Sequence, residues 1–262
     1  MLPLAGPRLP DSPKALADAL ERGLAAHGLN AREVVATGTW PALDLLRIDL
    51  TGAQVSRPQL PSPRDDTMNG TVTVGRFEVL AEPGEIEGAP AHVRLHGDGA
   101  AFVIAPVSAE ESVLLIRRAA HGELTIEIRH EDLERLVHSL ASKAASGHGV
   151  EIKNVKLACT SRGPRAVSIV AEVVAKMFIA TATCTLSGDI DLDEYLNARL
   201  AHLQFHGEGM VANLAGGFIR PQLAALEGES FPLMNFALGE INLRDVQLVV
   251  GDSLRVSAQF GS

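Results

Sequence analysis

The segment 166–191 most constrains the fold, because it holds strand-forming residues with no proline and no glycine before Gly188. A typical strand has about 5–6 residues, so one strand through this segment could not lie flat in a compact domain. We therefore expect a single long strand that coils around something, and its small, inert side chains favour an apolar ligand. The apolar residues alternate along this segment, at odd-numbered positions first and at even-numbered positions afterwards. They are Val167, Ile169, Ala171 and Val173, then Phe178, Ala180, Ala182, Cys184 and Leu186.

The amino-acid composition limits the kinds of partner that the protein could bind. Of the 262 residues, 46% are hydrophobic and only 4% aromatic, which predicts a large core of aliphatic side chains. The formal net charge of −9 opposes nucleic-acid binding, because cationic side chains must displace the counterions of the phosphates. The same charge disfavours broad attachment to anionic lipid. Peripheral contact with a membrane through a local basic patch stays open.

From the sequence we expect neither a signal peptide nor a membrane-spanning segment. No segment approaches the roughly 20 apolar residues that cross a bilayer, and residues 1–7 lack the basic start of a signal peptide. As the sequence stands we expect a cytoplasmic protein, or a periplasmic or cell-envelope protein if an export segment was removed. A turn over 161–165 would place Cys159 opposite residue 168, so we expect Cys159 and Cys184 to be buried free thiols.

Apolar residues at helical spacing predict helices over 12–28, 131–146 and 210–226, the last kinked at Pro221. We interpret 40–46 as a connector or a turn of helix, a slip near Gly52 as a bulge, 57–66 as a loop and 82–88 as a turn. The other expected strands cover 31–37, 47–57, 71–80, 91–105, 112–118, 122–129, 150–160, 240–250 and 253–260. The segment 195–206 fits either a helix or a strand, and we favour a strand because it leads straight into Gly207 and Gly209.

This order of elements predicts an α+β fold, in which a long, strongly curved antiparallel β-sheet wraps around amphipathic helices. We expect 1–262 to be a single elongated domain. It has two loosely similar halves, about 1–129 and 130–262, each with an amphipathic helix near its start.

The sequence contains no residue pattern with the spacing that metal binding or catalysis needs. His202 and His206 would converge on a metal only on a helix, since on a strand they lie about 13 Å apart. The same objection applies to His92 and His96, which lie in an expected strand. No Gly-x-Ser-x-Gly elbow or phosphate-binding loop is present. We therefore expect no metal site, no cofactor and no enzymatic activity.

Two further matches are also weak. The Gly207–Ala212 segment fits a dinucleotide fingerprint, but Glu208 would lie beside a pyrophosphate and no βαβ unit follows. The Asp189–Asp193 segment resembles the start of a calcium loop, yet Glu194 and Leu200 replace the glycine and the glutamate that such a loop needs. We interpret the first as a strand-to-helix turn and the second as a solvated strand end.

A family resemblance completes the prediction. The chain resembles the LmeA-like phospholipid-binding proteins of the tubular lipid-binding (TULIP) superfamily. That resemblance implies a curved antiparallel sheet around a long helix, with an apolar groove for acyl chains. It is carried by 16–24 leading to Trp40-Pro-Ala-Leu-Asp-Leu-Leu46, by 47–55, by His130-Glu-Asp-Leu133, by Leu223-Ala-Ala-Leu226 before Phe231-Pro-Leu, and by 239–250.

The predicted function is binding of a phospholipid or another acyl-chain lipid, for lipid transfer or sensing, without chemical turnover. The alternative is a structural or assembly module whose apolar surfaces bind a protein partner. A third hypothesis is an enzyme that acts on a hydrophobic substrate, which would need a titratable pair inside the groove. The candidate lipid-binding residues are Phe178, Ala180, Ala182, Leu186, Leu214, Phe218, Ile219, Phe231, Met234 and Phe236.

Overall fold

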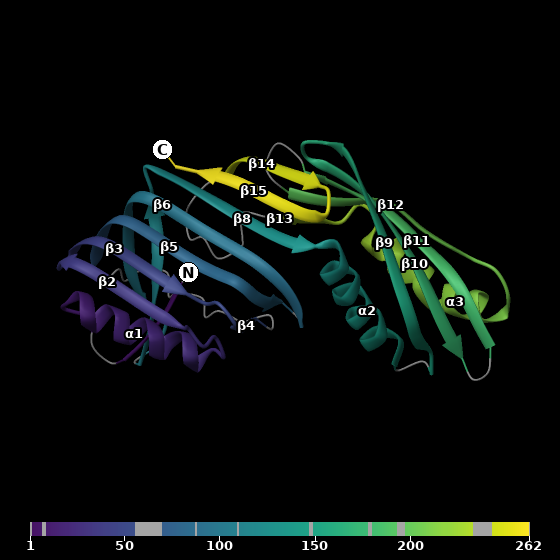
Figure 1. The fold of residues 1–262 in the computed structure, drawn as a ribbon, viewed down its shortest axis with the longest axis horizontal. Coiled ribbons are helices and arrows are strands. Elements are labelled where there is room, and N and C mark those ends of the chain that lie inside the picture. The colour runs from purple at the N-terminus through teal and green to yellow at the C-terminus, as the bar shows by residue number, and fades with distance from the viewer. Residues whose placement is uncertain are drawn as a thin grey trace. The chain divides into compact units, whose positions relative to one another are not determined.

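The structure is a computed structural model that describes residues 2–6, 9–55, 70–86, 88–108, 110–146, 149–177, 180–192, 197–232 and 243–261. These residues form an α+β fold of mostly antiparallel sheets (Figure 1). The chain divides into two compact units. Unit 1 comprises 1–127, 234–246 and 256–262, and unit 2 comprises 128–233 and 247–255. A single domain with two similar halves stays a prediction, and we describe each unit by itself.

A ten-stranded sheet supplies most of unit 1, in the order β14-β15-β8-β6-β5-β3-β2, with β7 beside β6, β1 beside β7 and β4 beside β5. Most of its strand pairs are antiparallel, whereas β3 and β4 each pair parallel with β5. The elements are β1 (Leu2–Ala5), α1 (Pro13–Ala26), β2 (Glu33–Thr39), β3 (Ala42–Asp49), β4 (Gln54–Val55), β5 (Thr71–Ile86), β6 (Ala89–Pro106), β7 (Glu111–Arg118), β8 (His121–Arg129), β14 (Leu243–Val250) and β15 (Ser253–Phe260). Residues 128–129 of β8, 247–250 of β14 and 253–255 of β15 are assigned to unit 2.

The predicted first helix is confirmed as α1. Ser12 caps it, because the Ser12 hydroxyl accepts a hydrogen bond from the Ala15 backbone N–H at 3.3 Å. Leu16, Leu20 and Leu24 lie one turn apart on the face of α1 that is buried. The rest of the core of unit 1 is mostly aliphatic, and the aromatic Phe77 and Phe102 are among its largest buried side chains.

Unit 2 contains an antiparallel five-stranded sheet in the order β13-β12-β11-β10-β9. Its elements are α2 (His130–Ser146), β9 (Glu151–Gly163), β10 (Ala166–Met177), β11 (Ala180–Leu192), β12 (Asn197–Gly207), α3 (Met210–Leu226) and β13 (Ser230–Pro232). The predicted helices over 131–146 and 210–226 are thus confirmed, as is the strand before α3. Among the described residues, no helix is both long and apolar enough to span a membrane.

The single long strand predicted over 166–191 is wrong. The segment forms two strands, β10 and β11, that pair antiparallel from Ala166 opposite Asp191 to Met177 opposite Ala180. Cross-strand partners lie on the same face of a sheet, and here an odd-numbered residue always faces an even-numbered one. The change of parity in the apolar pattern is therefore the signature of a hairpin with one buried face. Phe178 and residue 179, which separate the strands, lie outside the described residues.

Two connections in unit 1 also differ from prediction. The segment 40–46 is not a connector or a helical turn, because β3 begins at Ala42 and pairs with both β2 and β5. The segment 82–88 is not a simple turn, because β5 continues to Ile86. A shift of register between Ala81 and Gly84 accommodates Pro83, which cannot donate a hydrogen bond to a regular ladder.

Candidate functional site

One face of the β10–β11 hairpin is apolar and small. Val173 lies directly opposite Cys184, and Ala175 lies opposite Ala182. Side chains two residues apart on a strand point to the same face. Leu186, two residues after Cys184, therefore extends this face along β11.

Both helices of unit 2 cover that face. On α2, Leu133 and Val137 pack against a buried cluster of β9 and β10 residues that includes Val173. On α3, Ala215 belongs to a second cluster with Cys184. Because Val173 and Cys184 are cross-strand partners, the two helices lie on the same side of the sheet. Leu186 packs against both clusters.

A cavity of about 240 Å³ lies between the two helices and the sheet. Its wall is almost entirely apolar, with Gln222 as the one polar amide among the residues that line it. Burial raises the pKa of the Cys184 thiol, so this side chain stays neutral. We call this space the apolar cavity; it is lined by Ala141, Ala145, Val150, Ile152, Val173, Ala175, Cys184, Leu186, Phe205, Ala215, Ile219, Gln222 and Leu223.

Alanines explain why the space is not filled. Ala141 and Ala145 on α2, Ala175 on β10 and Ala215 on α3 all line the cavity, and none reaches beyond its Cβ. Larger aliphatic residues at these positions would fill the gap as an ordinary core does, at the packing density of an organic crystal. The cavity is therefore a consequence of residue size at four positions on three elements.

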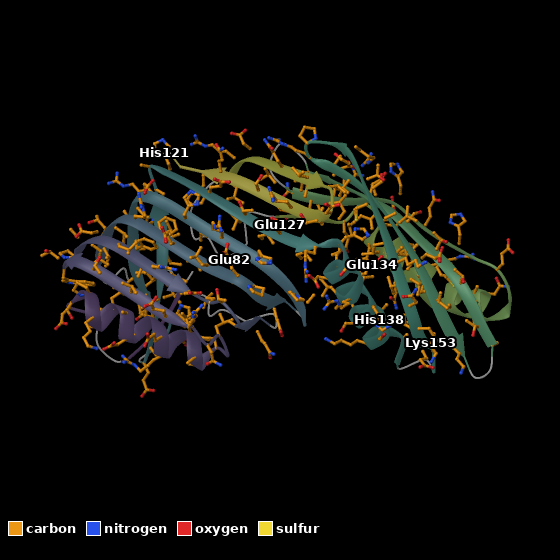
Figure 2. The ribbon with its side chains drawn as sticks, in the orientation of Figure 1. Glu82, His121, Glu127, Glu134, His138 and Lys153 are labelled. Atoms are coloured by element: carbon orange, nitrogen blue, oxygen red, sulfur yellow. The ribbon has the colours of Figure 1, made fainter. Side chains whose placement is uncertain are left out.

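Polar side chains fix α2 beside the outer strand of the sheet. His130 Nε2 donates to the Leu157 carbonyl oxygen at 2.7 Å, and Glu134 accepts from the Leu157 N–H at 2.7 Å. His138 Nε2 donates to the Ile152 carbonyl oxygen at 3.2 Å. Residues four apart share one face of a helix, and Figure 2 shows Glu134 and His138 on α2 beside β9. These contacts occupy backbone groups of β9 and hold α2 in place.

The opposite face of the sheet is polar. Asp189 accepts hydrogen bonds there from the Ser168 hydroxyl at 2.6 Å and from His202 Nδ1 at 2.8 Å. Arg162 lies 3.5 Å from Asp189 and also binds Asp191. The sheet of unit 2 thus has one charged face and one face that carries the apolar cavity.

Asp189 should make the stability of unit 2 depend on pH in the acidic range. The hydrogen bond from Ser168, and then that from His202, lower the pKa of Asp189 from 3.8. A carboxylate with a lowered folded-state pKa stabilises the fold fully above its unfolded pKa, and this contribution is lost as the pH falls through the folded pKa. In urea unfolding, Asp189→Asn should be less stable than wild type near about pH 5, and the two should converge near about pH 2. A gap that stays constant over this range would contradict the assignment.

The candidate lipid-binding residues fall into four groups in the structure. Leu186 and Ile219 line the apolar cavity. Ala180 and Ala182 are half-buried, and Ala182 packs against the cluster around Cys184. Leu214 is 47% exposed, because it lies on the outer side of α3 beside the inward Ala215. The others, Phe178, Phe218, Phe231, Met234 and Phe236, have side chains outside the described part of the structure.

Most of the cavity wall was not foreseen from the sequence. The apolar patterns of the sequence include Val173, Cys184 and Ala141, but they do not mark Ile152, Phe205 or Ala145. The parity change after Val173 was the usable signal, since it would have paired β10 with β11 and joined their apolar residues into one face. The contribution of α2 carried no such signal, because amphipathic spacing does not say which sheet a helix covers.

The remaining motifs have plain structural roles. Within the described ranges, no group of three or more His, Cys, Asp or Glu side chains could hold a metal ion. Gly207 to Ala212 connects β12 to α3, as expected of a strand-to-helix turn. Both cysteines are free; Cys184 is buried and Cys159 is half-buried, opposite Ile169.

Comparison of the chain with protein-family models, with curated proteins and with solved structures finds no match in any of the three. The resemblance to the tubular lipid-binding proteins therefore stays a prediction. The apolar cavity and the side chains around it are the observations that bear on function.

Proposed function

We propose that this protein binds an acyl-chain lipid in the apolar cavity, for lipid transfer or sensing, without chemical turnover. The observation that carries the proposal is the cavity itself: about 240 Å³ bounded by aliphatic side chains, one phenyl ring, a neutral thiol and one amide. A space with so few polar groups offers water little compensation for its lost hydrogen bonds, and it favours apolar guests.

The volume also limits the ligand. With about 30 Å³ for a group the size of a water molecule, the cavity holds roughly eight such groups. Eight methylenes would contribute about 6 kcal/mol before ordering costs, at roughly 0.8 kcal/mol each. This fits part of one acyl chain. Sites for whole drug-sized ligands usually measure about 300–1,000 Å³, so we assign to the cavity the inner segment of a single chain.

The finer form of the proposal is a strongly curved sheet that wraps around the helices as in the tubular lipid-binding proteins. It is supported by the position of α2 and α3 on one face of the sheet in unit 2. Binding without turnover is supported by the cavity wall, which includes no Asp, Glu, His, Lys or Arg side chain among the described residues that line it. General acid–base chemistry needs such a group within hydrogen-bond reach of the substrate.

Uptake of a fluorescent fatty acid by the purified, delipidated protein tests the proposal. In a Cys159→Ser variant, the only remaining thiol is Cys184, which lines the cavity. Saturating fatty acid should slow the alkylation of Cys184 by iodoacetamide at alkaline pH, where the thiol ionises, because the chain covers the sulfur atom. In the matched Cys184→Ser variant, alkylation of Cys159 should be unchanged by the fatty acid.

Two results would count against lipid binding. One is a protein that takes up no fatty acid and carries no extractable lipid after purification. The other is uptake that leaves the alkylation rate of Cys184 unchanged, which would place the lipid elsewhere. A stable oligomer without lipid uptake would favour the alternative, an assembly module with a protein partner.

A further inference from the structure

A second depression, lined in part by polar side chains, adjoins the apolar cavity. It measures about 610 Å³ and lies between residues 202–206 of β12 and the C-terminal half of α3. Phe205 and Leu223 line both spaces, so these two side chains form a wall that the cavity and the depression share. The two spaces are therefore neighbours within unit 2.

Arg220 is the cation of this depression. Its guanidinium carbon lies 5.7 Å from the centre of the Phe205 ring, in the geometry of a cation–π contact. Arg220 is exposed, and within the described part of the chain no carboxylate pairs with it. An arginine held over the ring that separates the depression from the cavity, with its hydrogen-bond donors available, is suited to an anion.

The carboxylate of the depression, Glu227, is already engaged. It accepts the backbone N–H groups of His202 at 2.8 Å and of Leu203 at 2.7 Å. These hydrogen bonds, that from Leu203 first, lower the pKa of Glu227. Glu227 therefore stays ionised while it accepts the backbone N–H groups of β12. The guanidinium of Arg220 remains available to bind a ligand.

We propose that Arg220 binds the anionic headgroup, a carboxylate or a phosphate, of the amphiphile whose chain occupies the apolar cavity. This inference rests on the proposed function. The apolar cavity is lined by Ile219, which precedes Arg220, and by Leu223, one turn further along α3. The same helix therefore offers contacts for the chain and a cation for the headgroup. Guanidinium binds carboxylate and phosphate through paired N–H donors.

Binding of a fluorescent fatty acid and of its methyl ester tests the proposal. The two ligands have the same chain, and only the acid is anionic. Wild type should bind the acid more tightly than the ester, and this preference should shrink as salt is added. Arg220→Gln should weaken binding of the acid about fivefold, the upper end for an exposed ion pair, and leave binding of the ester unchanged. Arg220→Lys should retain part of the preference.

The matched control is Arg244→Gln, which makes the same change of charge at an exposed position of β14 in unit 1. It should alter binding of neither ligand. If Arg220→Gln weakens binding of the acid and of the ester equally, the headgroup assignment is overturned and lipid binding is left intact. The same conclusion follows if wild type binds the two ligands with equal affinity. Displacement of the acid by inorganic phosphate alone at similar concentrations would also overturn it. Wild type that binds neither ligand would overturn both proposals.

Discussion

Ala141→Phe should abolish most of the lipid binding and leave the protein folded. Ala141 lies on α2 with its Cβ at the wall of the apolar cavity. A phenyl ring at this position would occupy more than half of about 240 Å³, since a cavity of about 150 Å³ already holds a benzene molecule. If half of the buried methylenes are excluded, about 3 kcal/mol is lost, which is roughly a 100-fold weaker Kd for a fluorescent fatty acid.

The stability of the Ala141→Phe variant shows whether the ring fills the cavity or disrupts the fold. A ring that fits the cavity should raise the free energy of unfolding by about 0.5–2 kcal/mol in the absence of lipid. Ala215→Leu, which adds a smaller group from α3, should weaken binding less and serves if the ring does not fit. Ala225→Phe, at an exposed position of α3, is the matched control and should bind as wild type does. Unchanged binding in both cavity variants would show that the chain binds elsewhere.

Phe77→Ala should cause a large loss of stability in unit 1, about 3–5 kcal/mol. The Phe77 ring is 2% exposed and packs edge-on against Phe102, with ring centres 5.5 Å apart. It also covers Gly97, its cross-strand partner: a Cβ at Gly97 would lie 2.4 Å from Phe77 Cε1. Removing the ring would leave a void and uncover a strand that has no side chain of its own at that point.

Trp40, the only tryptophan of the chain, lies in unit 1, and its fluorescence reports on the unfolding of that unit by guanidinium. Phe77→Leu keeps most of the volume and should cost less than about 1.5 kcal/mol. Leu9→Ala, at a side chain that is 43% exposed, should change stability by less than about 0.5 kcal/mol. A loss in Phe77→Ala no greater than that in Leu9→Ala would contradict this account of the core.

The helices could be predicted because their signals are local. Leu16, Leu20 and Leu24 repeat at the period of a helix, and Ser12 supplies the cap, so α1 needs no information from the rest of the chain. The segment 210–226 has the same spacing, and α3 begins and ends where its apolar pattern does. Most strands were also recognisable from alternation.

The segment 166–191 shows where local signals stop. Alternation indicates β-structure throughout, but without a glycine or proline it does not mark a turn, so one strand is predicted where two exist. Pairing of Val173 with Cys184 joins residues that no local pattern connects. In the hairpin, the odd-numbered apolar residues of β10 and the even-numbered ones of β11 lie on one buried face. A single strand would have placed them on opposite faces. No coiled strand is left to favour an apolar ligand, and that preference now depends on the cavity.

The sequence by itself determined the position of the three helices, the β-structure of most other segments and the absence of recognisable catalytic motifs, because these follow from residue identity and spacing along the chain. Only the tertiary structure decided which faces meet. Ala141, Ala175 and Ala215 come from a helix, a strand and another helix, and no local pattern brings them together. A cavity is the volume that packed neighbours fail to fill, so it exists only once those neighbours are in place.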